Sequence, residues 1–238
     1  MLHRMVRGRI GDDRDPTDVV NVRRKVLLWR DAEVSGMEAA DERARQRIAR
    51  SGSARKSLLE PGDRTLNELT QFSAAETLRD GRQVEIRAQR PGDRDGLQAA
   101  IRRISSQSLY RRFFGVRREF SDKEASSFLD IDFVNQVALV VVAAEDSGPN
   151  IVGGGRYVVV NPGQAEVAFA VVDEYQGQGL GGALMRHLTK IARAAGLKEL
   201  IAEVLAENAP MLKVFEKCGL PMRMQREHDV VHVVMQLV

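Results

Sequence analysis

The sequence contains a single cysteine, Cys218, among its 238 residues, which excludes an intramolecular disulfide and a metal site built from several cysteines. Cys218 falls inside a predicted helix, where we expect a buried, unreactive thiol. Neither sign of charge dominates, because 36 basic residues are balanced by 33 acidic ones, so nucleic-acid binding has no support. No apolar run is long enough to cross a membrane, and the first residues lack the apolar core of a signal peptide. We therefore expect a cytoplasmic protein that binds neither nucleic acid nor membrane.

The first 80 residues differ from the rest in composition. Charged residues occupy nearly every face of a helix drawn through 37–50, so this segment has no apolar stripe to bury. Turn-forming residues follow at 51–53 and 61–63. We predict that residues 1–80 form a mostly disordered or marginally helical extension, with a regulatory or partner-docking arm as the alternative. Residues 81–238 are expected to form one compact domain.

The expected compact domain contains strand-like and helix-like patterns in turn. Val84–Ala88 alternates with a period of two residues, whereas Leu97, Ile101 and Ile104 fall on one face of a helix. Further helices are expected over 105–116, 121–130, 183–195 and 209–217, and further strands over 136–144, 151–160, 166–172, 197–205, 222–226 and 230–237. The order β-α-α-β-β-β-α-β-α-β-β predicts an α+β fold.

Residues 176–182, Gln-Gly-Gln-Gly-Leu-Gly-Gly, lie between a predicted buried strand and a long predicted helix, and we call them the glycine turn. Glycines lack the Cβ atoms that would keep an anion away from the backbone amides. The first turn of the following helix directs free N–H groups and its positive dipole end at the same space. The glycine turn therefore predicts a ligand that carries phosphate.

A dinucleotide is one such ligand, because Gly177, Gly179 and Gly182 match the pattern G-x-G-x-x-G, with Glu203 about twenty residues further on. A dinucleotide-binding fold needs several more strand–helix units after these glycines. Only 56 residues follow Gly182. The chain is too short after the glycine turn for this alternative.

The glycine turn also fits the pattern R/Q-x-x-G-x-G/A, and at this point the sequence resembles the GNAT superfamily of N-acetyltransferases. Ala165–Phe169 resembles the family's fourth strand, and 206–211 followed by 216–220 resembles its second CoA-contacting segment. The alternative is a glycine-rich turn that binds nothing. The resemblance covers about residues 82–238 and implies the GNAT fold, a mixed, mostly antiparallel central sheet flanked by helices. It also implies acetyl-CoA as the acetyl donor, without a metal.

The resemblance assigns cofactor contacts to individual residues. Main-chain groups of Ala170, Val171 and Val172 are expected to pair with the pantetheine arm, and one N–H is expected to face the thioester oxygen. Asn208 is expected to reach the pantetheine; it could instead cap the following helix, and the two roles are compatible. The pyrophosphate is expected on the backbone of Gln176, Gly177, Gln178, Gly179, Leu180, Gly181 and Gly182.

Glu166 is the expected general base. An alkylammonium has a pKa of about 10.4, so an amine acceptor must lose a proton before it attacks. Glu166 lies on an apolar strand ten residues before Gln176, where many GNAT enzymes carry a glutamate. The alternative is a glutamate that faces solvent.

One position departs from the family pattern. Many relatives carry a tyrosine seven residues after the motif asparagine to protonate the leaving thiolate, whereas this chain has Phe215. Water or another group must then protonate the thiolate, or it leaves as the anion. Tyr157 and Tyr175 are not obvious substitutes, and His187 is expected to be a surface or hydrogen-bonded histidine.

The segment 108–114, Ser-Leu-Tyr-Arg-Arg-Phe-Phe, resembles bacterial protein lysine acetyltransferases that modify acyl-CoA synthetases. The alternative is that its aromatic residues are core and its arginines a solvated surface. In those proteins a large regulatory domain is often fused to the catalytic domain, and an 80-residue extension is too short for one. The resemblance implies direct attack by a protein lysine in a ternary complex, with an acyl-CoA synthetase as one candidate partner. The alternatives are a small-molecule amine as acceptor and a non-catalytic sensor that binds acyl-CoA.

Overall fold

The computed structural model describes residues 68–114 and 129–237. The predicted disorder of residues 1–67 and most of the helix predicted at 121–130 lie outside the described residues. The elements are β1 (Ser73–Thr77), β2 (Gln83–Ala88), the 3₁₀ turn η1 (Pro91–Asp93), α3 (Arg94–Arg103), α4 (Ser106–Phe113), β3 (Gln136–Glu145), β4 (Gly148–Asn161), β5 (Gln164–Val171), the 3₁₀ turn η2 (Asp173–Tyr175), α6 (Leu180–Ala194), β6 (Glu199–Leu205), α7 (Ala209–Glu216), β7 (Met222–Glu227) and β8 (Val230–Gln236).

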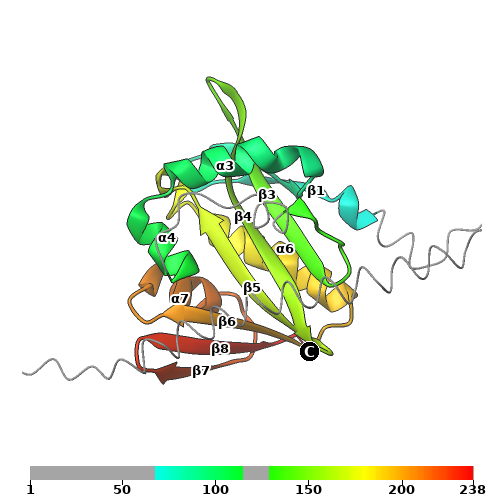
Figure 1. Cartoon of the computed structure of the whole chain (residues 1–238), viewed down its shortest axis with the longest axis vertical. Coiled ribbons are helices and arrows are strands. Elements are labelled where there is room, and N and C mark those ends of the chain that lie inside the picture. Colours follow the sequence, from blue (N-terminus) through cyan, green and yellow to red (C-terminus); the bar gives the residue numbers. More distant parts are fainter. Residues whose placement is uncertain (1–67, 115–128, 238) are drawn as a thin grey trace, which may run out of the picture. The chain divides into compact units, whose positions relative to one another are not determined.

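In the described part of the chain, eight strands form one sheet in the order β1-β2-β3-β4-β5-β6-β8-β7 (Figure 1). Neighbouring strands are antiparallel except β5 and β6, which are parallel. Parallel neighbours need a crossover connection, and α6 provides it. The predicted α+β fold, a mixed and mostly antiparallel sheet flanked by helices, is confirmed.

The sheet begins earlier in the chain than the sequence predicts. The expected boundary at residue 80 falls between β1 and β2, and β1 is paired with β2 along its whole length. The sequence of β1, Ser-Ala-Ala-Glu-Thr, has no large apolar side chain, so it carries no hydrophobic periodicity. Tertiary contacts hold this strand instead, because Glu76 accepts hydrogen bonds from Arg186 at 2.9 Å and from His187 at 2.7 Å on α6.

The packing of α6 decides which side chains of β5 face away from the core. Gly155 of β4 leaves room for two side chains, because a Cβ there would lie 2.5 Å from Phe169 Cδ1 and 3.2 Å from Leu188 Cδ1. Phe169 of β5 therefore faces α6. Side chains alternate along a strand, so Glu166 lies on the opposite face of the sheet. Figure 1 shows α6 behind the sheet and α3 across its near side.

Candidate functional site

The strands β5 and β6 pair for only part of their length. Their parallel ladder ends at Glu166 and Ile201, although β5 runs on to Val171 and β6 to Leu205. Figure 1 shows that β5 and β6 diverge. We call the diverging ends of β5 and β6 the fork.

The fork exposes main-chain groups of β5. The N–H of Val172 donates to the carbonyl oxygen of Val152 at 3.0 Å, so this residue is bonded on the β4 side. Main-chain groups alternate in direction along a strand, which turns those of Val171 and Phe169 toward β6. There the ladder supplies no further partner. The ladder thus leaves the N–H of Val171 and the main-chain groups of Phe169 to an extended ligand in the fork, whereas the carbonyl oxygen of Val171 accepts from Gln176 Nε2 at 3.0 Å.

The three residues expected to pair with a pantetheine arm differ in the direction of their main-chain groups. Val172 has both main-chain groups engaged, because its carbonyl oxygen also accepts from the N–H of Tyr175 at 3.0 Å. Ala170 is in register with Gly154, and alternation directs its main-chain groups toward β4. Of the three residues expected to pair with a pantetheine arm, only Val171 turns its main chain toward the fork. The direction of ladder bonds depends on strand pairing, which the sequence motif does not show.

The glycine turn follows directly on β5 and η2. Gly177 has a φ angle of 75° and Gly179 one of 99°, a region of backbone conformation that favours glycine. The first helical bond of α6 runs from the N–H of Ala183 to the carbonyl oxygen of Gly179 at 3.1 Å. The N–H groups of the three residues before Ala183 therefore have no partner within the helix. This arrangement suits an anion, as the sequence predicts.

The other two glycines of the turn have different surroundings. A Cβ on Gly181 would lie 2.9 Å from Val214 Cγ2, so α7 needs a glycine at this position of α6. A Cβ on Gly182 would meet no protein atom within 4 Å. The fold itself gives no steric reason for glycine at 182, whereas a ligand that approaches the helix closely does.

Gln176 fixes the start of the glycine turn. Its Nε2 donates to Val171 O at 3.0 Å, to Asp173 Oδ1 at 3.1 Å and to Ser108 Oγ at 3.1 Å. Gln176 therefore connects the fork end of β5 to α4. The contact to Ser108 gives the first residue of the segment 108–114 a place beside the glycine turn.

Arg79 also holds the glycine turn, and the sequence analysis missed it. Its guanidinium donates from Nη1 to the carbonyl oxygen of Gly177 at 3.0 Å, and its main-chain N–H donates to that of Gln178 at 3.3 Å. Arg79 is 98 residues away from Gly177 in the sequence. No local motif connects positions so far apart, and only the extra strand β1 brings them together.

Glu166 lies at the closed end of the fork. It is half-buried and in register with Val158 of β4 and Ile201 of β6. Since directly opposed residues share a face, the carboxylate is flanked by two aliphatic side chains. Its strand continues through Val171 to the glycine turn, so one strand joins the predicted base to the predicted anion site.

Asn208 caps α7, as its alternative role predicts. Its Oδ1 accepts from the N–H of Met211 at 3.3 Å. The preceding residue, Glu207, lies 3.7 Å from Nε of Arg111 on α4. The cap leaves the side-chain NH₂ of Asn208 available, because no described residue accepts from it.

The side chains that the sequence offers in place of the expected tyrosine are buried or hydrogen-bonded to other residues. Phe215 is 1% exposed and its ring lies 6.2 Å from that of Phe169. Burial raises the pKa of Tyr157 to about 12. Tyr175 donates its hydroxyl to Glu145 at 2.8 Å, and His187 is hydrogen-bonded to Glu76. None of these side chains is a free proton donor.

A metal centre has no support in the parts of the chain that are described, where no three His, Cys, Asp or Glu side chains gather to hold an ion. Within the same residues, no helix is both long enough and apolar enough to span a membrane.

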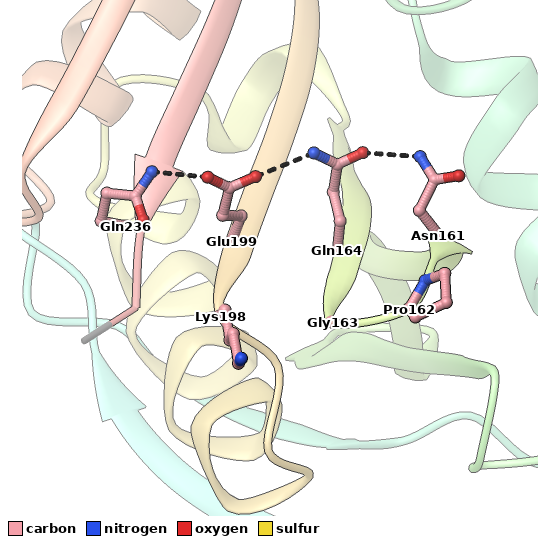
Figure 2. Close-up of a pocket in the computed structure, with 7 residues that line it drawn as sticks. All are labelled: Asn161, Pro162, Gly163, Gln164, Lys198, Glu199 and Gln236. Carbon is pink, nitrogen blue, oxygen red and sulfur yellow. Dashed lines mark hydrogen bonds between the residues drawn. The ribbon is translucent and has the colours of Figure 1, made fainter.

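A separate polar hollow lies at the far end of β5 from the glycine turn (Figure 2). Its side chains bond to one another: Asn161 donates to Gln164 at 2.9 Å, and Gln164 and Gln236 donate to Glu199 at 2.9 and 2.7 Å. These two amides lower the pKa of Glu199. The amide and carboxylate groups of these four residues bond to one another, and the hollow contains none of the residues that the sequence predicts for the site.

Known proteins share the family and the fold. Residues 103–220 match the model of the acetyltransferase (GNAT) family. The chain is 36% identical over 155 residues to acetyltransferase PA5475 of Pseudomonas aeruginosa. The match covers 65% of this chain and 82% of that protein. It is 32% identical over 144 residues to acetyltransferase Pat of Mycolicibacterium smegmatis, covering 60% of this chain but only 42% of Pat.

A solved structure agrees with these matches. The GNAT domain of S. lividans PAT superimposes with a TM-score of 0.62 at 32% sequence identity. The match covers 69% of this chain and 96% of that domain.

Proposed function

The chain belongs to the GNAT family of acetyltransferases, and on that premise we propose that it transfers the acetyl group of acetyl-CoA to the ε-amine of a protein lysine. The observation that carries the proposal is the position of Glu166. Its carboxylate lies where the β5–β6 ladder ends, on the strand that leads to the glycine turn. Amine acetylation needs a proton acceptor and an anchored thioester close together, and β5 offers a place for both.

The residues present fit acetyl-CoA, which supplies a thioester-activated acetyl group on a long arm that ends in a pyrophosphate. The free N–H groups at the start of α6 and the open space beside Gly177 and Gly182 suit the pyrophosphate. The main-chain N–H of Val171 suits the amide-rich arm. The free side-chain NH₂ of Asn208, at the start of α7, is a further donor to the arm.

In the proposed reaction Glu166 accepts a proton from the acceptor ammonium, directly or through a water molecule. The neutral amine then attacks the thioester carbonyl carbon, and a C–N bond forms. The N–H of Val171 stabilises the negative charge that develops on the carbonyl oxygen. When the C–S bond breaks, the thiolate leaves as the anion or takes a proton from water, since Phe215 carries no hydroxyl.

The surroundings of Glu166 support lysine as the acceptor. In register across the sheet, Ile201 of β6 lies beside Glu166, and Val234 of β8 lies beside Ile201. Both aliphatic side chains are half-buried, and Glu203, the next residue of β6 on this face, is 36% exposed at its side chain. A lysine can lay its aliphatic stem on such a surface and direct its ammonium to a carboxylate. The resemblance of residues 108–114 to protein lysine acetyltransferases supports the same acceptor.

The test is an acceptor screen by mass spectrometry. Acyl-CoA synthetases are incubated with acetyl-CoA and the protein, and acetylated lysines are mapped, with Glu166→Gln as the matched inactive control. We expect lysine acetylation that depends on Glu166. Acetylation of polyamines or other small amines but of no protein would replace the protein acceptor with a small-molecule amine. Tight binding of acetyl-CoA without transfer of the acetyl group to any acceptor, and so without release of CoA, would indicate a sensor. The cytoplasmic location stays a prediction.

A further inference from the structure

The glycine turn carries no positive charge of its own. The family pattern allows arginine or glutamine at its first position, and this chain has Gln176 there. The remaining residues, 177–182, are glycine, glutamine and leucine. A pyrophosphate is an anion that proteins usually bind with arginine or lysine in addition to backbone N–H groups. The cation must therefore come from another part of the fold.

Arg79 is placed to provide it. Arg79 lies in the tight connection between β1 and β2, where Leu78 and Arg82 are joined by a main-chain hydrogen bond of 2.8 Å. Its guanidinium lies against the glycine turn, with Nη1 3.0 Å from the carbonyl oxygen of Gly177. Nε lies 3.9 Å from the position of a Cβ on Gly179. The positive charge thus lies beside Gly177 and Gly179, the two glycines of the turn that have a positive φ angle.

The charge of Arg79 is not neutralised by a carboxylate of the described residues. The acidic residues around it have other partners: Asp80 pairs with Arg82 at 2.7 Å, and Glu76 pairs with Arg186 at 2.9 Å. Arg79 itself is exposed. A guanidinium has five N–H donors, and one of them suffices for the carbonyl of Gly177. The others are available to an anion at the glycine turn.

We propose that Arg79 is the cation of the pyrophosphate site. It has two effects there. Its hydrogen bonds turn the carbonyl oxygens of Gly177 and Gln178 toward itself, so that these oxygens do not repel a phosphate. Its guanidinium adds a positive charge that the turn lacks. This inference rests on the acetyl-CoA site of the proposed function, but not on the identity of the acceptor.

The experiment measures binding to two ligands by titration calorimetry. Acetyl-CoA carries the pyrophosphate, whereas S-acetyl-pantetheine carries only the arm and the thioester. We expect Arg79→Gln to raise the Kd for acetyl-CoA on the order of tenfold to a hundredfold, as the loss of a charge-assisted hydrogen bond implies. The Kd for S-acetyl-pantetheine should stay within about twofold of its value in the unmodified protein. This ligand has no pyrophosphate, so the loss of the guanidinium at a distant position should not weaken its binding. In Arg79→Lys, which keeps the charge, the Kd for acetyl-CoA should lie between those of the unmodified protein and of Arg79→Gln.

Arg226→Gln is the matched control. Arg226 is an exposed arginine whose Nε donates to the carbonyl oxygen of His228 at 3.0 Å in the β7–β8 turn, at the opposite edge of the sheet. The Arg226→Gln substitution removes the same charge and the same type of contact as Arg79→Gln, and the Kd for acetyl-CoA should not change. The salt dependence of acetyl-CoA binding should also be weaker in Arg79→Gln than in the unmodified protein.

Three results would overturn the inference. Arg79→Gln could bind acetyl-CoA as tightly as the unmodified protein, both ligands could lose affinity equally, or the control could lose as much as Arg79→Gln. Equal loss of both ligands would mean that the substitution disturbs the fold as a whole and not the pyrophosphate site. If the protein acetylates no acceptor while Arg79→Gln still loses acetyl-CoA selectively, the proposed function fails and this inference stands.

Discussion

Adjacent glycines in the first turn of α6 allow the fold and the ligand site to be tested separately. A methyl group at 182 would meet no protein atom within 4 Å, whereas one at 181 would lie 2.9 Å from Val214 Cγ2. That second distance is roughly 0.6 Å shorter than an ordinary carbon–carbon contact. Gly182→Ala and Gly181→Ala are therefore a matched pair with opposite expected effects.

Gly182→Ala should leave the free protein as stable as before or more stable by about 0.4–1 kcal/mol, because alanine restricts the unfolded chain. Its methyl group occupies the space proposed for the pyrophosphate, so at least one charge-assisted hydrogen bond should be lost. The Kd for acetyl-CoA should then rise about tenfold to a hundredfold.

Gly181→Ala should destabilise the protein, because overpacking against α7 costs about 1–3 kcal/mol and the gain in helix preference offsets only part of it. A net loss of roughly 1 kcal/mol lowers Tm by about 2–4 °C in a protein of this size. Acetyl-CoA binding should change less than in Gly182→Ala, since this methyl group points to Val214.

Thermal denaturation of the free proteins and calorimetric titration with acetyl-CoA measure both effects. Unchanged acetyl-CoA affinity in Gly182→Ala would show that the ligand does not lie over this helix start, and the site assignment would be wrong. Unchanged stability in Gly181→Ala would show that α6 and α7 do not pack as closely as described.

Three further predictions concern the base, the turn and a buried ion pair. Glu166→Gln should lower kcat by a factor of about 10² or more and leave the Kd for acetyl-CoA unchanged. Steady-state kinetics measure kcat, and an unchanged kcat would exclude Glu166 as the base. Gly179→Glu places a charged side chain at a φ of 99° beside the phosphates, and calorimetry should show weak or no acetyl-CoA binding. Asp93, buried and held by Arg87 at 2.7 Å, has its pKa lowered. Desolvation is the largest single effect and raises the pKa, but the hydrogen bonds from Arg87 and from the N–H of Arg90, together with the charges of both arginines, outweigh it. Its contribution to stability is present above the unfolded pKa of about 3.9 and is lost as the pH falls through the folded value. Asp93→Asn should cost about 3 kcal/mol in urea denaturation near pH 7, and the difference from the unmodified protein should shrink in acid.

Much of the candidate site was predictable because its signals are local. The glycine turn between a buried strand and a helix is readable from consecutive residues, and so is the cap at Asn208. The order of strands and helices follows from hydrophobic periodicity, and all elements expected between 81 and 238 in the described residues were found. The strand β1 was missed, since its small and polar side chains produce no periodic signal.

The sequence by itself determined the order of the elements, and it predicted a phosphate-binding turn and Glu166 as the candidate base. Only the tertiary structure decided that the β5–β6 ladder ends at Glu166, that Val171 rather than Val172 turns its main chain to the fork, and that Arg79 reaches the turn. The physical reason is that periodicity, caps and glycine turns depend on neighbouring residues. The pairing of strands and the approach of a side chain 98 residues away depend on how the whole sheet is assembled.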